Sequence, residues 1–311
     1  MEQVNISLFG KFEMQYAGHQ VVELGGRKVR ELLCYLLLHR ERPHPREKLA
    51  SILWADQCTT TQSKAYLRKI LWKLQNALAS YDGLNEFGLI KTERQWVELN
   101  TADFWLDLDI FERTYTNVKD IPGSNLEDQE VRQVEKAIQL HEGELLENWY
   151  QEWCLLERER VNNMYLLMLD KLMEYCETCR MCETGLEYGT WSLQIDRARE
   201  STHQHLMRLY HLAGDRTQAL RQYEECRVAL QDELGVEPSE PTTILYEQIK
   251  SDHSQVPSFV QSPVVTQSRN NDSMSDRLQR INNLQQLQVN ILCQIQKEIS
   301  AIREELDQTS R

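Results

Sequence analysis

The sequence has no long apolar segment and few cysteines. Its longest uninterrupted apolar run is the seven residues from Leu32 to Leu38, whereas a membrane-spanning helix needs about 20. The opening stretch MEQVNISLFGKFE has no positively charged start followed by an apolar run, so no secretory signal is expected. Eight cysteines in 311 residues are too sparse for a disulfide-stapled fold. We therefore expect a cytoplasmic protein with no part in a membrane.

The sequence also lacks the motifs that usually accompany catalysis. It contains no GxxxxGK[ST] phosphate-binding loop. No Ser-His-Asp order, nucleophile elbow or paired-carboxylate motif stands out among its 48 Asp and Glu residues, which read as a solvated surface. We expect a protein that is not an enzyme and that needs no cofactor.

The charge is distributed unevenly along the chain. The net charge is -13, yet the first 100 residues carry 14 Lys and Arg against 11 Asp and Glu, which leaves 21 and 37 for the remainder. A locally basic end on an acidic protein is typical of contact with a polyanion. The first 100 residues are therefore where a nucleic acid would bind.

The pattern of the first 102 residues predicts a winged helix-turn-helix domain of the α+β class. Apolar alternation predicts strands, and a later period of three to four predicts amphipathic helices. Pro45 suits the first turn of a short second helix. The predicted elements are strands at 4–9, 11–16 and 21–24, helices from 27, after 45 and over 61–78, and a hairpin at 87–100.

The third of these helices carries the main functional signal. Helical spacing places Leu67, Ile70, Leu71, Leu74, Ala77 and Leu78 on one side, which must face the core. Between Lys64 and Lys73 there are four cations and no acid, so we expect the neutralising anion to come from outside. A major groove admits one α-helix, and Arg or Lys pairs with guanine edges or phosphates. The alternatives are a merely basic surface helix and, for Trp72, packing on a neighbouring helix.

The hairpin provides a second expected contact, a wing that reaches phosphates or the minor groove. The predicted partner is double-stranded DNA, and no metal is required for its binding. The predicted DNA-binding residues are Lys64, Arg68, Lys69, Trp72, Lys73 and Asn76 on the helix, with Lys91, Thr92, Arg94 and Gln95 on the hairpin.

Residues 103–250 follow a helical pattern with an internal repeat of 34 residues. Leu172, Met173, Arg180, Gly185 and Leu186 fall opposite Leu206, Met207, Gly214, Ala219 and Leu220. This period is that of tetratricopeptide (TPR) helix pairs, so we predict about three such pairs. Gly185 and Ala219 are the small positions at which paired helices would cross closely.

Three cysteines within this region have the spacing C-x2-C-x2-C, at Cys176, Cys179 and Cys182. Such a run could bind zinc or an iron–sulfur cluster, or form a redox-sensing pair. The repeat instead places Cys176 inside a helix pair and the other two around a turn. Because free cysteine is often a small buried hydrophobe, we favour structural cysteines.

The C-terminal segment divides into a linker and a helix. Residues 251–275 are rich in Ser, Gln, Asn and Pro and have no lasting period, as a flexible linker does. Residues 276–307 return to helical spacing, with apolar residues at a mean step of about 3.67, so little left-handed supercoil is expected. We predict an amphipathic helix that self-associates or forms a coiled coil; the alternative is docking onto the TPR-like region.

Two groups of segments resemble a known family. LFGKFEM, GRKVRELLCYLLLHRERPHPREKLASILW, AYLRKILWKLQNAL and WVEL resemble the winged helix of SARP-type (antibiotic regulatory protein) bacterial transcriptional activators. DFWLDLDIFERTY, GELLENWYQEWCLLERERVNNMYL, HQHLMRLYHLAGDRTQALRQYEECRVALQDELGVEPSEPT and LYEQI resemble the bacterial transcriptional activator domain (BTAD) that follows it. The resemblance covers roughly residues 5–250, and Gly214–Pro238 is its most specific part. Trp72 and Lys69 depart from the smaller residues expected on the recognition helix.

The resemblance implies a mainly α-helical transcriptional activator that binds promoter-proximal repeats as a homodimer or higher oligomer. It also implies contact with RNA polymerase through the sigma or alpha subunit. The alternative is a helical-repeat adaptor, or a redox or ligand sensor, that uses its TPR-like domain for protein interaction.

Overall fold

The structure is a computed structural model that describes residues 4–21, 24–54, 59–81, 88–100 and 104–251. Contacts divide the chain into two units, residues 1–253 and 254–311. The expected linker, apart from Ser251, and the expected helix at 276–307 lie outside the described residues. The division into domains at 102/103 likewise stays a prediction.

A four-stranded sheet opens the chain. Its order is β3-β2-β1-β7, formed by β1 (Val4–Ser7), β2 (Glu13–Tyr16), β3 (His19–Gln20) and β7 (Phe104–Leu106). Val4 and Ile6 are fully buried while Asn5 between them is exposed, so one face of β1 packs on the core.

Two expectations for this sheet were wrong. β7 lies where a helical pattern was expected, and it pairs in parallel with β1, with Leu106 opposite Ile6. A three-residue strand whose partner lies about 100 residues away leaves no local periodicity to detect. The third described strand is His19–Gln20, and the two described residues of the expected strand 21–24, Val21 and Leu24, are buried outside strands.

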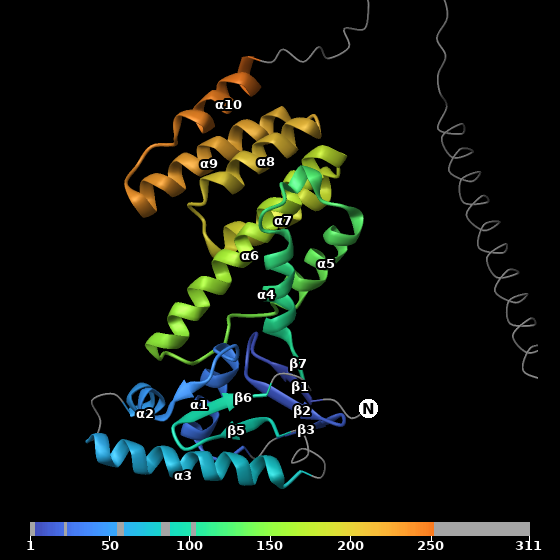
Figure 1. Cartoon of the computed structure of the whole chain (residues 1–311). Helices are drawn as coiled ribbons and strands as arrows, with labels where there is room; N and C mark the ends of the chain where they lie inside the picture. Colours follow the sequence, from blue (N-terminus) through green and yellow to red (C-terminus); the bar gives the residue numbers. More distant parts are fainter. Residues whose placement is uncertain (1–3, 22–23, 55–58, 82–87, 101–103, 252–311) are drawn as a thin grey trace, which may run out of the picture. The chain divides into compact units, whose positions relative to one another are not determined.

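Three helices and a hairpin complete the N-terminal region, as expected for a winged helix-turn-helix (Figure 1). Thr59 and Gln62 form a capping box that starts α3: Gln62 N–H donates to Thr59 Oγ1, and Thr59 N–H donates to Gln62 Oε1. The two strands of the hairpin, β5 and β6, form a sheet with β4, a strand of two residues directly before α2. The strand order of this sheet is β4-β6-β5. These elements are α1 (Arg27–Leu38), β4 (His44–Pro45), α2 (Arg46–Trp54), α3 (Thr60–Ala79), β5 (Ile90–Thr92) and β6 (Trp96–Leu99).

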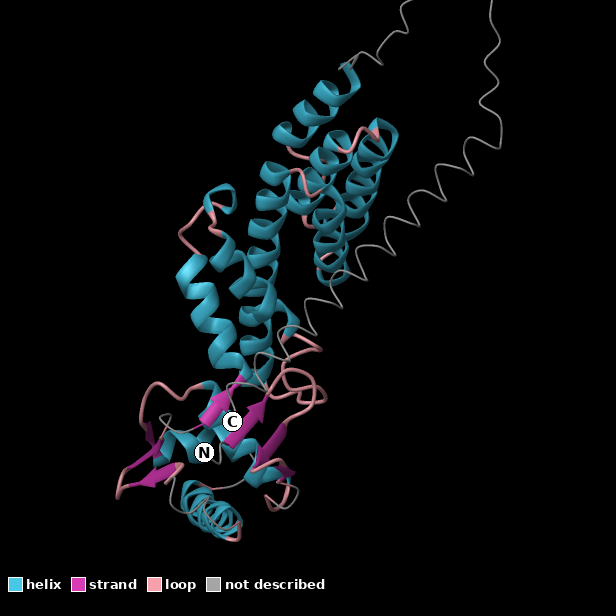
Figure 2. Cartoon of the chain, turned by 90° about the vertical axis from the view of Figure 1, so that its right-hand side faces the viewer, coloured by secondary structure: helices cyan, strands magenta, loops and turns pink. Residues whose placement is uncertain are grey.

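The rest of the described chain is helical (Figure 2). The helices pack in sequence-adjacent pairs, α4 with α5, α6 with α7 and α8 with α9, in agreement with the expected TPR-like architecture. They are α4 (Asp107–Val118), α5 (Asp128–Gln139), α6 (Glu152–Cys179), α7 (Cys182–Ile195), α8 (Glu200–Leu212), α9 (Arg216–Leu234) and α10 (Glu240–Ser251), with a short 3₁₀ turn, η2 (Gly123–Asn125).

The 34-residue repeat is visible in the turns and in the close crossings. Arg180 and Gly214, which the repeat aligns, both have left-handed backbone, with φ of 57° and 82°. A Cβ added at Gly185 would lie 2.8 Å from Leu209 Cδ1 and 3.0 Å from Cys176 Cβ. At Gly185, where the repeat places a small residue, there is therefore no room for a larger side chain between the helices.

One hydrophobic core runs from the strands through α1 and α3 into α4–α6. The buried carboxylate of Asp107 accepts hydrogen bonds from the backbone N–H groups of Leu8, Phe9 and Leu108 at 2.6–3.0 Å. Burial raises the pKa of Asp107 to about 6. This carboxylate joins the end of β1 to the first turn of α4.

Candidate nucleic-acid interface

The two sides of α3 differ as the sequence predicts. Leu67, Ile70, Leu71, Leu74 and Leu78 are buried, while Ala77 is half-buried. The helix α3 lies at the end of the N-terminal region away from α4 and α6 (Figure 1). The residues opposite its buried side are exposed: Ala65, Arg68, Lys69, Trp72, Lys73 and Asn76. The Trp72 side chain is 62% exposed, so it does not pack on a neighbouring helix.

One of the four cations of α3, Lys64, forms an ion pair with a carboxylate of the same chain. Lys64 Nζ lies 2.6 Å from Glu47 Oε1 of α2, and the hydrogen bond and charge of Lys64 lower the pKa of Glu47. The expectation that no internal acid neutralises the basic face is therefore wrong for Lys64, because the acid comes from another helix, 17 residues away. No ion pair within the described residues involves Arg68, Lys69 or Lys73.

The hairpin, or wing, lies beside α3 and is tied to it. Glu93 N–H donates to Trp96 O at 2.9 Å and closes the turn between β5 and β6. Lys91, Arg94 and Gln95 are exposed, as a wing contact requires. Thr92 is half-buried, and its Oγ1 accepts a hydrogen bond from Gln75 Nε2 of α3 at 3.3 Å. Gln75, which links the two predicted contact elements, was not predicted from the sequence.

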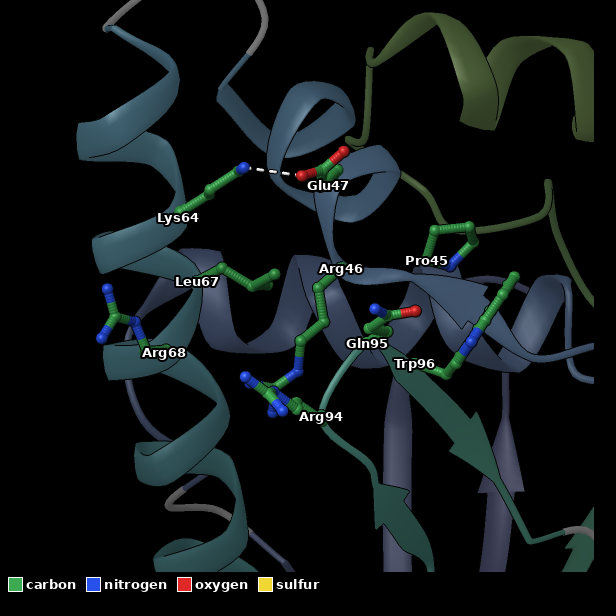
Figure 3. Close-up of a pocket in the computed structure, with 9 residues that line it drawn as sticks. All are labelled: Pro45, Arg46, Glu47, Lys64, Leu67, Arg68, Arg94, Gln95 and Trp96. Atoms are coloured by element: carbon green, nitrogen blue, oxygen red, sulfur yellow. Dashed lines mark hydrogen bonds and ion pairs between the residues drawn. The ribbon is translucent and has the colours of Figure 1, made fainter.

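A cavity of about 500 Å³ lies between α2, α3 and the wing (Figure 3). Arg46 and Arg94 point toward the same part of it in this view. Pro45, Arg46, Glu47 and Trp96 were not predicted from the sequence, because the α2–α3 packing and the β4–β6 pairing bring them together beside α3. The residues that line the cavity are Pro45, Arg46, Glu47, Lys64, Leu67, Arg68, Arg94, Gln95 and Trp96.

Cys176, Cys179 and Cys182 lie around the turn between α6 and α7. Cys176 is buried, and burial raises the pKa of its thiol to about 12, which keeps it protonated. Cys179 ends α6 and Cys182 begins α7, on the two sides of the turn that the repeat predicts. Across the described ranges, no group of His, Cys, Asp and Glu has the geometry to bind a metal ion.

The fold and this face define a class: a winged helix-turn-helix joined to a TPR-like helical region. Residues 106–250 match the model of the bacterial transcriptional activator domain. This match and the fold confirm the resemblance to SARP-type activators.

The fold is also similar to a solved structure, Mycobacterium tuberculosis EmbR in complex with a low-affinity phosphopeptide. The TM-score is 0.70 at 20% identity, and the match covers 80% of this chain and 65% of EmbR, so this chain corresponds to less than two thirds of that protein. The comparison with curated proteins finds no match. None of the described helices combines the length and apolar composition of a membrane span.

Proposed function

We propose that this protein is a sequence-specific DNA-binding transcriptional activator that places α3 in the major groove. The observation that supports this most directly is the exposed face of α3. Three cations there, Arg68, Lys69 and Lys73, have no carboxylate partner among the described residues, although the protein as a whole is acidic. Phosphates of a duplex would supply the missing charge.

The residues divide by their expected roles. Arg68, near the middle of the exposed face, is the candidate for a guanine edge, and Asn76 for an adenine edge or a phosphate. Lys69, Lys73 and the wing residues Lys91 and Arg94 would contact phosphates, which fix the register of the helix on the duplex. Lys64 would exchange Glu47 for a phosphate at little cost, because exposed ion pairs contribute little stability.

The helical region would serve the second half of the function. By resemblance to the family, we propose that it pairs copies of the chain on repeated promoter sites and contacts the sigma or alpha subunit of RNA polymerase in the cytoplasm. A footprint on the promoter would report the spacing of the repeats, which is a geometric consequence of how the copies are arranged.

A protein-interaction role without DNA is the second candidate. Leu212, Leu234 and Ile244 of the helical region are 42–63% exposed, as the surface of an adaptor would be. EmbR was solved with a phosphopeptide, which supports a partner-sensing role for a protein of this fold. The two candidates differ in whether the exposed face of α3 is needed for function.

The test is a triple variant, Arg68→Ala, Lys69→Ala and Lys73→Ala, in a gel shift with the DNA upstream of its own coding region. We expect specific binding to be lost. The salt dependence of residual binding should fall by about 1 in log–log slope for each lost phosphate contact. The single Arg68→Ala variant should cost about 1–3 kcal/mol of binding free energy if Arg68 pairs with a base.

The matched control is Lys119→Ala, Arg132→Ala and Lys136→Ala, which removes three exposed cations from α5 and the end of α4. This variant has the same net charge as the test variant and should bind DNA like the wild type. Unchanged DNA binding by the α3 variant would refute the assignment and favour the adaptor.

A further inference from the structure

The cavity between α2, α3 and the wing holds an excess of positive charge. Four of its nine lining residues are cations and one, Glu47, is an acid whose charge is already paired with Lys64. The other three cations, Arg46, Arg68 and Arg94, have no ion pair or side-chain hydrogen bond in the described part of the chain. Like charges in one cavity repel, so the arrangement becomes favourable when an anion enters.

Backbone hydrogen bonds hold two of these arginines in place. Arg46 N–H donates to Gln95 O at 2.9 Å, and Pro45 pairs with Trp96 in the β4–β6 ladder. The turn closed by Glu93 N–H and Trp96 O carries Arg94 at its tip. Arg46 directly follows β4 and Arg94 lies in the β5–β6 turn, so one small sheet anchors the backbone of both, and a ligand between them would not have to order a loop.

Arg46 has also lost part of its hydration. Its Nε is buried and has no hydrogen-bond partner among the residues that the structure describes. An unsatisfied buried donor is costly, and most such groups in proteins are paired. Part of the free-energy cost of removing water from Arg46 is therefore incurred in folding and not in the binding of the anion.

The chemistry of the lining selects the anion. A guanidinium presents a planar fork of donors that matches the oxygens of phosphate, and several guanidiniums together suit a group with several charged oxygens. Glu47 is the one carboxylate among four cations in the lining, so the wall stays net positive whether or not Lys64 holds it. We propose that this cavity binds a phosphate group between Arg46 and Arg94, and that on DNA this group is a phosphate of the duplex backbone.

The assignment to DNA rests on the proposed function. If α3 lies in the major groove and the wing reaches across the adjacent strand, the backbone of that strand passes between them, where the cavity opens. A phosphate held there would fix the angle at which α3 enters the groove without reading sequence. Arg46 is then a positioning residue for DNA recognition that belongs to neither the recognition helix nor the wing.

The test compares Arg46→Ala with Arg42→Ala, an exposed arginine four residues earlier that does not line the cavity. Arg46→Ala should weaken binding to specific and non-specific DNA alike, by about tenfold. It should also lower the salt slope by about 1. Arg46→Lys should keep the slope and recover only part of the affinity, because it keeps the charge and loses the fork. Arg42→Ala should behave as wild type.

A second measurement separates the two sources of phosphate and does not require DNA binding. The Arg46 side-chain Nε–H resonance is followed while inorganic phosphate is added to the full chain at constant ionic strength. A saturable shift that Arg94→Ala abolishes supports a phosphate site, and a tighter response to DNA than to inorganic phosphate assigns it to the duplex.

Three outcomes would overturn the proposal. They are an Arg46→Ala variant with wild-type affinity and slope, a change in base preference with no change in slope, and an Arg46 resonance that neither phosphate nor DNA moves. A wild-type protein that binds phosphate at Arg46 but no DNA would instead refute the proposed function and leave the phosphate site standing.

Discussion

Replacing Arg40 by alanine tests what couples the N-terminal region to the helical region. Arg40 follows α1, and its side chain is 5% exposed. Its Nη2 binds Asp109 Oδ1 at 3.0 Å and also the carboxylate of Glu112, both on α4, while Nη1 donates to Leu37 O at 3.3 Å. One buried guanidinium therefore links the end of α1 to the first helix of the helical region.

The expected loss of stability depends on the ion pairs that Glu112 and Asp109 retain when Arg40 is removed. Breaking a buried ion pair by removing one partner costs about 3–5 kcal/mol, because a buried charge is left alone. Here Glu112 keeps Arg160, Asp109 keeps Arg113, and the two acids are 17% and 27% exposed. We therefore expect Arg40→Ala to lower the free energy of unfolding by about 2–3 kcal/mol, below the full penalty.

Urea unfolding of Arg40→Ala and Arg113→Ala measures this directly. Arg113 pairs with the same Asp109 at 2.8 Å, but its side chain is 76% exposed, so its loss should cost no more than about 0.5 kcal/mol. Equal effects of the two substitutions would refute the reasoning, because burial of Arg40 would then contribute nothing. So would an Arg40→Ala variant within about 0.5 kcal/mol of the wild type.

Two further predictions concern the stability of the folded chain. Burial raises the pKa of Asp107 to about 6, so the folded state holds this proton more tightly than the unfolded chain, where the pKa is about 4. The contribution of Asp107 to the free energy of unfolding is therefore greatest below about pH 4 and is lost as the pH rises through about 6. The stability of the wild type relative to Asp107→Asn should thus fall by up to about 3 kcal/mol between pH 4 and 7.5; a difference independent of pH, measured by urea unfolding, would contradict this. At Gly123, an added Cβ would lie 2.3 Å from Lys171 O and 2.7 Å from Glu174 Cβ. Gly123→Ala should lower the thermal unfolding temperature, with a cost of about 1–3 kcal/mol, whereas Gly26→Ala, where nothing lies within 4 Å, should have little effect.

Much of the fold could be predicted because its signals are local. The spacing of Leu67, Leu71, Leu74 and Leu78 defines the buried side of α3, and the helix keeps that side in contact with the core over its whole length. The 34-residue repeat likewise predicted the close crossing at Gly185, because each repeat buries the same positions. Short strands escaped prediction, since β7 and β4 exist only through pairing with distant partners.

The candidate site divides in the same way. The sequence by itself determined which residues of α3 face outward, because helical periodicity separates the two sides of the helix. It also determined that the outward residues include cations and no acids. Only the tertiary structure decided that Glu47 reaches Lys64 and that Arg46 and Arg94 line one cavity. These contacts arise from the packing of α2 on α3 and from the pairing of β4 with β6, which is two residues long. They depend on which residues come close in space, and the spacing of residues along the sequence does not specify this.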